Sequence, residues 1–292
     1  MIVNFNGGDL TPSCLASLSE SEFAPSAVLV IDNASTDGSK ETLQPEHGKS
    51  IELIANNENL GFAKACNQGM KRACELGADF VFLFNNDARL ESNALGTLVE
   101  AAGRHPKAGL LGGKIYFGDG PKLWCAGMNV GFYPNLQDLR GFGKVDVGKF
   151  DVEEKVDALT GCGLLIRRAF IDEGGIFDED FFVYVEDLEL SLRAQSTGWT
   201  CLYVPAAVFY HDAGSTSGQG YSAWRKYMLA YNLVLFLKKQ GNIRLWLSFL
   251  ILDVLCWPFV LLVAILTGRS SGALAKGRGL LHAFLNTAAN PG

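Results

Sequence analysis

The chain has 292 residues, 48% of them hydrophobic, and a formal net charge of −6 at pH 7. This composition supplies a sizeable core for one large domain, or for one domain with an appendage. The acidic balance excludes a general nucleic-acid binder, because neutralising phosphates requires clustered Lys and Arg. Seven cysteines without a CxxC pair favour buried thiols in a reduced, cytosolic setting. We expect no cleavable leader, because no basic and apolar segment opens the chain.

Short apolar runs alternate with helical patterns through the first hundred residues. This pattern predicts an α/β fold with a largely parallel sheet, in which ligands bind beyond the carboxyl ends of the strands. Those ends carry short polar side chains: Asn6, Asp32, Asn59 and Asp87. We expect strands at 1–6, 27–31, 51–55 and 80–84, and helices at 10–18, 63–76 and 92–103.

The stretch 112–157 is rich in glycine and shows only weak strand patterns, so we expect an irregular region that shapes a second pocket. A strand is predicted at 157–168, and two short strands at 199–204 and 207–210 lead to His211. A neutral imidazole at a strand end can ligate a metal, but a lone histidine is more often structural.

An aromatic run lies between these strands. Phe181–Val185 predicts a short strand, and Glu186 and Asp187 follow at once, at the start of a helical pattern that Gly198 ends. A carboxylate pair at the end of an apolar run is well placed to act as an acid or a base. The alternative is that Asp187 simply caps the helix.

Beyond the last strand the pattern changes. Aromatic and basic side chains recur every three to four residues from Tyr221 to Lys239, which is typical of an amphipathic helix at a membrane or of a helix packed on the domain. The segment 245–267 is almost wholly apolar and long enough to span a bilayer. Asp253 and Pro258 interrupt it and basic residues flank both ends, so an in-plane or re-entrant hairpin rivals a full span. A helix of a soluble core is the least favoured interpretation.

Two strand ends indicate nucleotide and metal chemistry. Asp32 either caps the following turn or accepts hydrogen bonds from the imide or hydroxyl groups of a ligand. Asn85, Asn86 and Asp87 follow another strand. Mg²⁺ takes one or two carboxylates together with substrate phosphate oxygens, so a single Asp here is the minimal protein side of a metal site. A turn built by Asn and Asp is the alternative.

Seven motifs occur in order, and together they resemble those of family 2 glycosyltransferases: VNFNGG, VIDNASTDGS, NNENLGFAKACNQG, FLFNNDARL, TGCGLLIRR, FFVYVEDLELSLR and FYHDAGS. The similarity is to the bacterial branch of rhamnosyltransferases and galactofuranosyltransferases of cell-surface polysaccharides. It covers residues 1–217 and implies a GT-A fold, with a nucleotide-binding half at about 1–110 and an acceptor-binding half at about 111–217. Residues 218–292 would form amphipathic and hydrophobic helices.

The resemblance also implies which residues bind the donor: Asn6, Asp32, Asn33, Asn59, Gly61, Asn67 and Asn86. Asp32 would hold the uracil or thymine ring, and Asn6 would lie near the base and the ribose. Gly61 would let the backbone approach the donor, in a loop that Asn59 and Asn67 fix.

Asp87 stands within the family's DxD-type metal motif, in which Asn85 replaces the first Asp. The resemblance implies that Asp87 ligates Mg²⁺ or Mn²⁺ and that His211 completes the metal or diphosphate site. Thr160 and Gly161 would line the acceptor side.

Glu186 and Asp187 match the family's ED motif, in which the Asp is the usual catalytic base. Glu186 would bind an acceptor hydroxyl, or the two roles would be exchanged.

The implied activity is inverting transfer of a sugar from a dTDP- or UDP-linked donor to a hydroxyl of a glycan or polyprenyl-linked acceptor, in cell-surface polysaccharide synthesis. The chain would act at the cytoplasmic face of the cell membrane. Two alternatives remain. A membrane-tethered scaffold without turnover is disfavoured by the intact set Asp32, Asp87, Asp187 and His211. A sugar nucleotidyltransferase would carry a basic, glycine-rich phosphate loop, whereas the turn at 6–9 has no basic residue.

Overall fold

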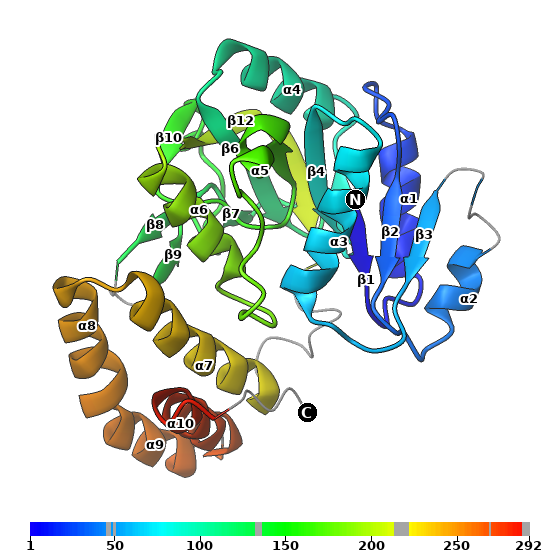
Figure 1. The fold of residues 1–292 in the computed structure, drawn as a ribbon. Coiled ribbons are helices and arrows are strands. Elements are labelled where there is room, and N and C mark those ends of the chain that lie inside the picture. Colours follow the sequence, from blue (N-terminus) through cyan, green and yellow to red (C-terminus); the bar gives the residue numbers. More distant parts are fainter. Residues whose placement is uncertain (45–47, 49–50, 132–135, 213–221, 269, 288–292) are drawn as a thin grey trace.

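The computed structural model describes residues 1–44, 48, 51–131, 136–212, 222–268 and 270–287. A ten-stranded sheet forms the centre of the molecule, with helices packed around it and a group of C-terminal helices beside it (Figure 1). The strands are β1 (Ile2–Asn4), β2 (Leu29–Asp32), β3 (Glu52–Ala55), β4 (Phe80–Asn85), β5 (Ala88–Leu90), β6 (Ala108–Phe117), β7 (Leu123–Cys125), β8 (Met128–Val130), β9 (Gln137–Leu139), β10 (Glu154–Val156), β11 (Leu164–Arg167) and β12 (Thr200–His211).

The helices follow the strands in the order that an α/β fold requires. They are α1 (Leu10–Ser19), α2 (Ser39–Leu43), α3 (Phe62–Glu75), α4 (Ala94–Arg104), α5 (Arg168–Asp172), α6 (Glu186–Ser196), α7 (Ala223–Gln240), α8 (Ile243–Phe249), a π-helical turn (Leu250–Leu255), α9 (Trp257–Leu266) and α10 (Ser270–Phe284). The predicted strands and helices of the first hundred residues are confirmed to within about two residues at each end.

The order of the strands indicates where a ligand would bind. The sheet runs β10-β12-β6-β11-β4-β1-β2-β3. β1, β2, β3 and β4 are mutually parallel, and the chain moves outward from β1 to β3 before it returns to β4 on the other side of β1. Adjacent connections therefore diverge at the carboxyl ends of β1 and β4, which is where open α/β sheets bind ligands.

The expectation of an irregular region at 112–157 is wrong at its beginning. β6 is a long, mostly buried strand between β11 and β12. Its glycines hide it from pattern analysis but serve packing: a Cβ on Gly113 would lie 2.0 Å from the Ala207 carbonyl oxygen, where β12 shifts its register against β6. The rest of the region holds only three-residue strands.

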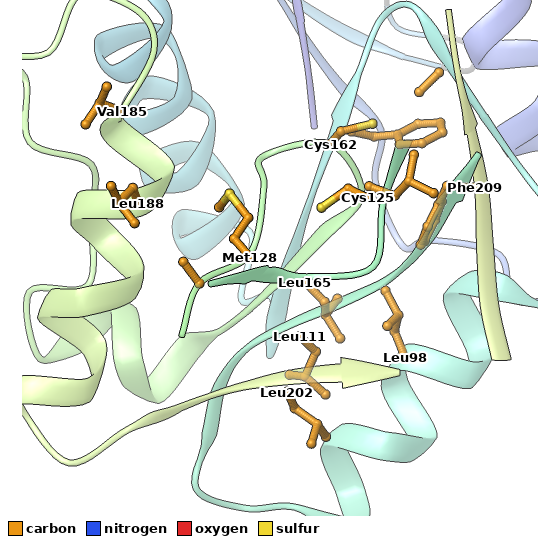
Figure 2. Packing of buried hydrophobic residues seen from close by; sticks show 14 of the residues in the cluster. Leu98, Leu111, Cys125, Met128, Cys162, Leu165, Val185, Leu188, Leu202 and Phe209 are labelled. Atoms are coloured by element: carbon orange, nitrogen blue, oxygen red, sulfur yellow. The ribbon is translucent and has the colours of Figure 1, made fainter. Parts of the chain in front are cut away.

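The main core connects the sheet to the helix that bears the carboxylate pair. Figure 2 shows Val185 and Leu188 in the same cluster as Met128, Cys162 and Phe209. All five are nearly inaccessible to solvent. This packing fixes the beginning of α6 against the sheet, since well-packed interiors leave little freedom for rigid-body shifts.

The C-terminal helices divide into a packed pair and an exposed apolar helix. α10 packs so closely on α7 that a Cβ on Gly279 would lie 2.4 Å from the Tyr227 carbonyl oxygen. Residues 243–266 form a 24-residue helix long and apolar enough to cross a membrane, with a mean hydropathy of 2.7 and only 11% of its most apolar window buried. The amphipathic helix expected from Tyr221 begins at Ala223; Tyr221 and the boundary at 217/218 lie outside the described residues.

Candidate active site

Asn4, which sequence reasoning missed, is the centre of the polar network at the end of β1. Its side chain is inaccessible to solvent. The Nδ2 atom donates to Asp32 Oδ2 at 2.7 Å and also lies 3.0 Å from two serine hydroxyls, and Oδ1 accepts from Thr11 Oγ1 at 2.6 Å. Thr11 Oγ1 accepts in turn from Asn86 Nδ2 at 3.2 Å. A polar residue inside a predicted strand was the available signal.

Asp32 is fully buried in this network. Its second carboxylate oxygen accepts from the Ser35 backbone N–H at 3.1 Å, so both oxygens are bound within the protein. The geometry matches the turn cap that the sequence allowed. Asn6 is exposed, and its Oδ1 accepts from the Thr36 N–H at 2.8 Å, joining the ends of β1 and β2. Contact of Asp32 or Asn6 with a nucleobase stays a prediction.

Asn33 holds the loop after β3. Its Nδ2 donates to Asn59 Oδ1 at 2.7 Å, and its Oδ1 accepts from the Leu60 N–H at 3.0 Å. Gly61 has φ of 84°, and a Cβ there would lie 2.6 Å from the carbonyl oxygen of Phe182. The steric need for glycine therefore comes from Phe182, and the expected approach to the donor stays a prediction.

Asn67 does not fix the Asn59–Gly61 loop as expected. Its amide makes a pair of 2.9 Å hydrogen bonds with the backbone of Phe177, and its Nδ2 also donates to Glu179. Asn67 thus ties α3 to the segment that precedes the carboxylate pair, because the amide group matches one peptide unit as donor and acceptor.

Asp87 and His211 meet although 124 residues separate them. His211 Nε2 lies 3.0 Å from Asp87 Oδ1, and their exposures are 6% and 7%. Pairing of β5 with β12 brings them together, and the ring of Trp124 stands edge-on to the imidazole at 4.4 Å.

The donor chemistry of this pair suits a divalent cation. A carboxylate and an imidazole are both metal ligands. The buried Nδ1 of His211 has no hydrogen-bond partner within the part of the chain that the structure describes. Those described residues contain no group of three or more His, Cys, Asp or Glu side chains arranged for a metal.

The turn before α6 is not the short strand predicted for Phe181–Val185. Tyr184 and Val185 both adopt left-handed backbone conformations, with φ of 72° and 74°, which end any extended chain. Phe181 is buried in the core, whereas the Tyr184 ring stands against Trp224 of α7. We call residues 181–187 the catalytic turn, after the role that the sequence motifs predict for Glu186 and Asp187.

Asp187 lies in the first turn of α6 and is not its N-cap; Val185 occupies that position without a side-chain cap. Asp187 Oδ2 accepts from the Gly161 N–H at 3.2 Å, and Oδ1 accepts from the Leu188 N–H at 2.8 Å. The carboxylate is thereby joined to the loop at Thr160 and Gly161; that this loop lines the acceptor side stays a prediction. Asp187 is partly exposed, whereas Glu186 is buried.

Burial shifts the pKa of both carboxyl groups. It raises the pKa of Glu186 well above the usual value, and the charge of Asp187 raises it further. Burial also raises the pKa of Asp187, but hydrogen bonds from Gly161, Leu188 and the Thr160 hydroxyl oppose this. Glu186 Oε2 has no partner among the described residues. Asp187 is therefore the carboxyl group that ionises first, because only its charged form is well hydrogen-bonded.

Helix α7 supports the catalytic turn from outside the sheet, a contact that sequence reasoning missed. Asn232 is inaccessible to solvent, and its Nδ2 donates to the carbonyl oxygens of Val183 at 2.7 Å and Tyr184 at 3.0 Å. Lys239 forms ion pairs with Asp178 and Asp180, just upstream. The only local signal was a polar Asn within an apolar helical pattern.

Comparisons with known proteins identify the family and the fold. The family model described as "Glycosyl transferase family 2" matches residues 1–175. The chain belongs to this family, and its architecture is that of the GT-A glycosyltransferases.

Among curated relatives, the N-acetylglucosaminyl-diphospho-decaprenol L-rhamnosyltransferase of Mycobacterium tuberculosis is 32% identical over 235 residues, 73% of this chain and 76% of the relative. The dTDP-rhamnosyl transferase RfbF of Shigella flexneri is 24% identical over 220 residues, 73% of this chain and 71% of the relative.

Solved structures show the same fold. The mannosyltransferase PcManGT from Pyrobaculum calidifontis, in complex with GDP-Man and Mn²⁺, has a TM-score of 0.60 at 16% identity, covering 98% of this chain and 86% of that one. GalNAc-T7 with UDP, GalNAc and Mn²⁺ has a TM-score of 0.62 at 17% identity; the match covers 81% of this chain but only 46% of that one.

Proposed function

We propose that this chain is an inverting, metal-dependent glycosyltransferase that moves a sugar such as L-rhamnose from a dTDP- or UDP-linked donor to a polyprenyl-diphosphate-linked acceptor. The observation that carries the proposal is Asp187: a partly exposed carboxylate, held by the Gly161 N–H, with a raised pKa. The names of the two rhamnosyltransferase relatives support the choice of sugar and acceptor.

The chemistry follows from where charge and protons must go. Asp187 takes the proton of the acceptor hydroxyl while the oxygen of that hydroxyl bonds to the anomeric carbon. The bond from that carbon to the diphosphate breaks on the opposite face, so the configuration inverts. A base in this position contributes on the order of 10²–10⁴-fold to the rate. Glu186 is only 5% exposed, which makes it the less accessible of the two carboxyl groups.

Asp87 and His211 would hold a divalent cation of the Mg²⁺ or Mn²⁺ type. When bound, such an ion neutralises charge on the leaving diphosphate. Asn86, joined through Thr11 to Asn4, keeps the end of β4 in a fixed relation to the end of β1. These residues prepare the donor side before any substrate arrives.

Membrane attachment fits a lipid-linked acceptor. The helix 243–266 exposes large apolar side chains, among them Leu255 at 73% and Leu266 at 77%. We place it at the cytoplasmic face, where nucleotide sugars are made. Fractionation of expressing cells should find the full chain with membranes.

The test uses the full chain in detergent, with a panel of dTDP-, UDP- and GDP-sugars, each with Mn²⁺, Mg²⁺ or EDTA. The acceptor is N-acetylglucosamine linked by a diphosphate to a polyprenol. We expect metal-dependent transfer from a dTDP- or UDP-linked sugar, and a product whose NMR spectrum shows inversion at the anomeric carbon. Retention of configuration, or transfer in EDTA, would contradict the proposed mechanism.

A further inference from the structure

Three cations from two helices gather at the junction of α7 and α10; we call Arg225, Lys226 and Lys276 the basic cluster. Lys226 is half-buried, which lowers its pKa, and the charges of Lys276 and Arg225 lower it further. The three positive charges repel one another, and an anion bound beside them would be attracted by all three. One carboxylate, Asp253, forms an ion pair with Lys276.

The position of two of these cations on α7 is itself unusual. Arg225 and Lys226 lie in the first turn of the helix, which contains no acidic residue and begins at the N-cap Ser222. The helix dipole makes this end positive, so cations are disfavoured and anions are favoured here. An anionic ligand would remove both the repulsion among the cations and the unfavourable dipole term.

On one side, the basic cluster adjoins the catalytic turn. The guanidinium of Arg225 lies 5.5 Å from the centre of the Tyr184 ring, and Tyr184 precedes Asp187 by three residues. The neighbouring Trp224 packs edge-to-face against the same ring, with 6.1 Å between the ring centres. Asn232, two turns along α7, bonds the carbonyl oxygen of Tyr184.

On its other side, the basic cluster adjoins the apolar helix 243–266. Asp253, the partner of Lys276, lies within that helix. Trp257 Nε1 donates to the Ala273 carbonyl at 3.1 Å, and a Cβ on Gly277 would lie 2.5 Å from the Trp257 ring. Figure 1 shows α9 and α10 together beside α7, on the side of the molecule that α7 presents away from the sheet.

The protein therefore presents a carboxylate base, a basic cluster and an apolar helix in succession. A lipid-linked sugar presents a hydroxyl, a diphosphate and a hydrocarbon chain in the same succession. We propose that the basic cluster binds the diphosphate of the polyprenyl-linked acceptor, with the sugar toward Asp187 and the lipid along residues 243–266. This inference rests on the proposed function and specifies how its acceptor is recognised.

The first test measures binding and needs no turnover. The full chain is titrated with phosphatidylcholine vesicles that contain a polyprenyl diphosphate. It is also titrated with phosphatidylcholine vesicles that contain phosphatidylglycerol in an amount that gives the same total negative charge. We expect the native chain to prefer the diphosphate vesicles. Arg225→Gln/Lys226→Gln should raise the dissociation constant for them by about 10- to 100-fold, which corresponds to a total of about 1.4–2.8 kcal/mol, because two cations facing the diphosphate are lost.

The matched control is Lys144→Gln/Lys155→Gln, which removes the same charge from exposed positions outside the C-terminal helices. It should bind as the native chain does. Equal binding by the cluster variant would overturn the proposal. An equal loss on both kinds of vesicle would also overturn it, since the cluster would then be a general contact for anionic lipid. If thermal unfolding shows that the double variant is not folded, Lys226→Gln alone carries the test.

A second test uses turnover. With the diphosphate-linked acceptor, the cluster variant should show a raised KM for the acceptor and an unchanged donor affinity. With an alkyl glycoside that lacks the diphosphate, variant and native chain should have the same kcat/KM. Equal defects on both acceptors would overturn the diphosphate assignment. Absence of transfer by the native chain would overturn the proposed function, while the vesicle result would still decide the binding site.

Discussion

The donor side and the catalytic turn use buried polar groups in opposite ways. On the donor side, the carboxylate of Asp32 and the amides of Asn4 and Asn33 are bound by neighbouring side chains and backbone. In the catalytic turn, Glu186 Oε2 lacks a partner among the described residues, and two consecutive non-glycine residues are left-handed. The buried polar groups around Asp32 are thus hydrogen-bonded without a ligand, whereas the catalytic turn keeps an unpartnered carboxylate oxygen and a strained backbone.

That strain must be balanced by contacts from other elements. A left-handed non-glycine residue costs about 1–3 kcal/mol, and a β-branched residue such as Val185 is an outlier there. The Phe62 N–H donates to the Phe182 carbonyl at 2.6 Å, and Asn232 binds the next two carbonyls. The comparison teaches that α3 and α7, which carry no predicted catalytic group, hold the backbone of residues 182–184, just before the proposed base.

Among variants of the two regions, the largest loss of activity is expected for Asp187, the proposed base. Asp187→Asn keeps the shape and one of the two backbone hydrogen bonds, from Gly161 or from Leu188, but removes the proton acceptor. We expect kcat to fall by about 10²–10⁴-fold with donor affinity unchanged. Turnover and nucleotide-sugar binding are measured together, with Asp172→Asn on exposed α5 as the control. Retained turnover would return Asp187 to a structural role and direct the search to Glu186.

The next effect concerns the donor side. Asp87→Ala removes the carboxylate that pairs with His211, and transfer should fall by roughly 10²-fold or more, because the leaving diphosphate loses its cation. Mn²⁺ binding in the presence of nucleotide should weaken in parallel, as followed by electron paramagnetic resonance. Asp119→Asn, an exposed partner of Arg89, is the control. Full activity of the native chain in EDTA would leave Asp87 as a turn residue.

The sequence predicted β1–β4 because buried parallel strands are continuous apolar runs. It missed β6, since glycines at 112 and 113 imitate a loop, and it misread Phe181–Val185, since no residue type there signals a left-handed backbone. The approach of His211 to Asp87 came from the motif resemblance, not from local pattern. The contact of Asn232 with the turn spans 48 residues, and its local signal, a polar Asn within an apolar helical pattern, does not identify the partner.

A smaller effect is expected when the support from α7 is removed. Asn232→Leu preserves size but deletes the two hydrogen bonds to the turn. We expect kcat to fall about tenfold, which corresponds to about 1.4 kcal/mol, with donor affinity unchanged. Tyr231→Phe removes a hydrogen bond from the same helix to Thr287, away from the turn, and should keep kcat. A normal kcat with a lowered melting temperature would show that Asn232 only stabilises the fold.

The smallest effect concerns the cost of burying the Glu186 carboxyl group. It is tested through the pH dependence of the free energy of unfolding. The pKa of Glu186 is raised well above 4.5 in the folded chain by burial. Above about pH 4.5 the unfolded chain therefore releases this proton while the folded chain retains it, and this group lowers the free energy of unfolding as pH rises. Glu186→Gln is nearly isosteric with the protonated acid and removes that loss.

We expect the variant to be more stable than the native chain at pH 7, with the difference vanishing as pH falls below 4.5. Urea unfolding at several pH values measures it. Glu100→Gln, at an exposed position on α4, should show no such trend. A variant that is less stable at pH 7 would mean that the ionised Glu186 is stabilised in the turn. The contrast between the hydrogen-bonded groups around Asp32 and the strained catalytic turn would then fail at Glu186, the residue on which it depends most.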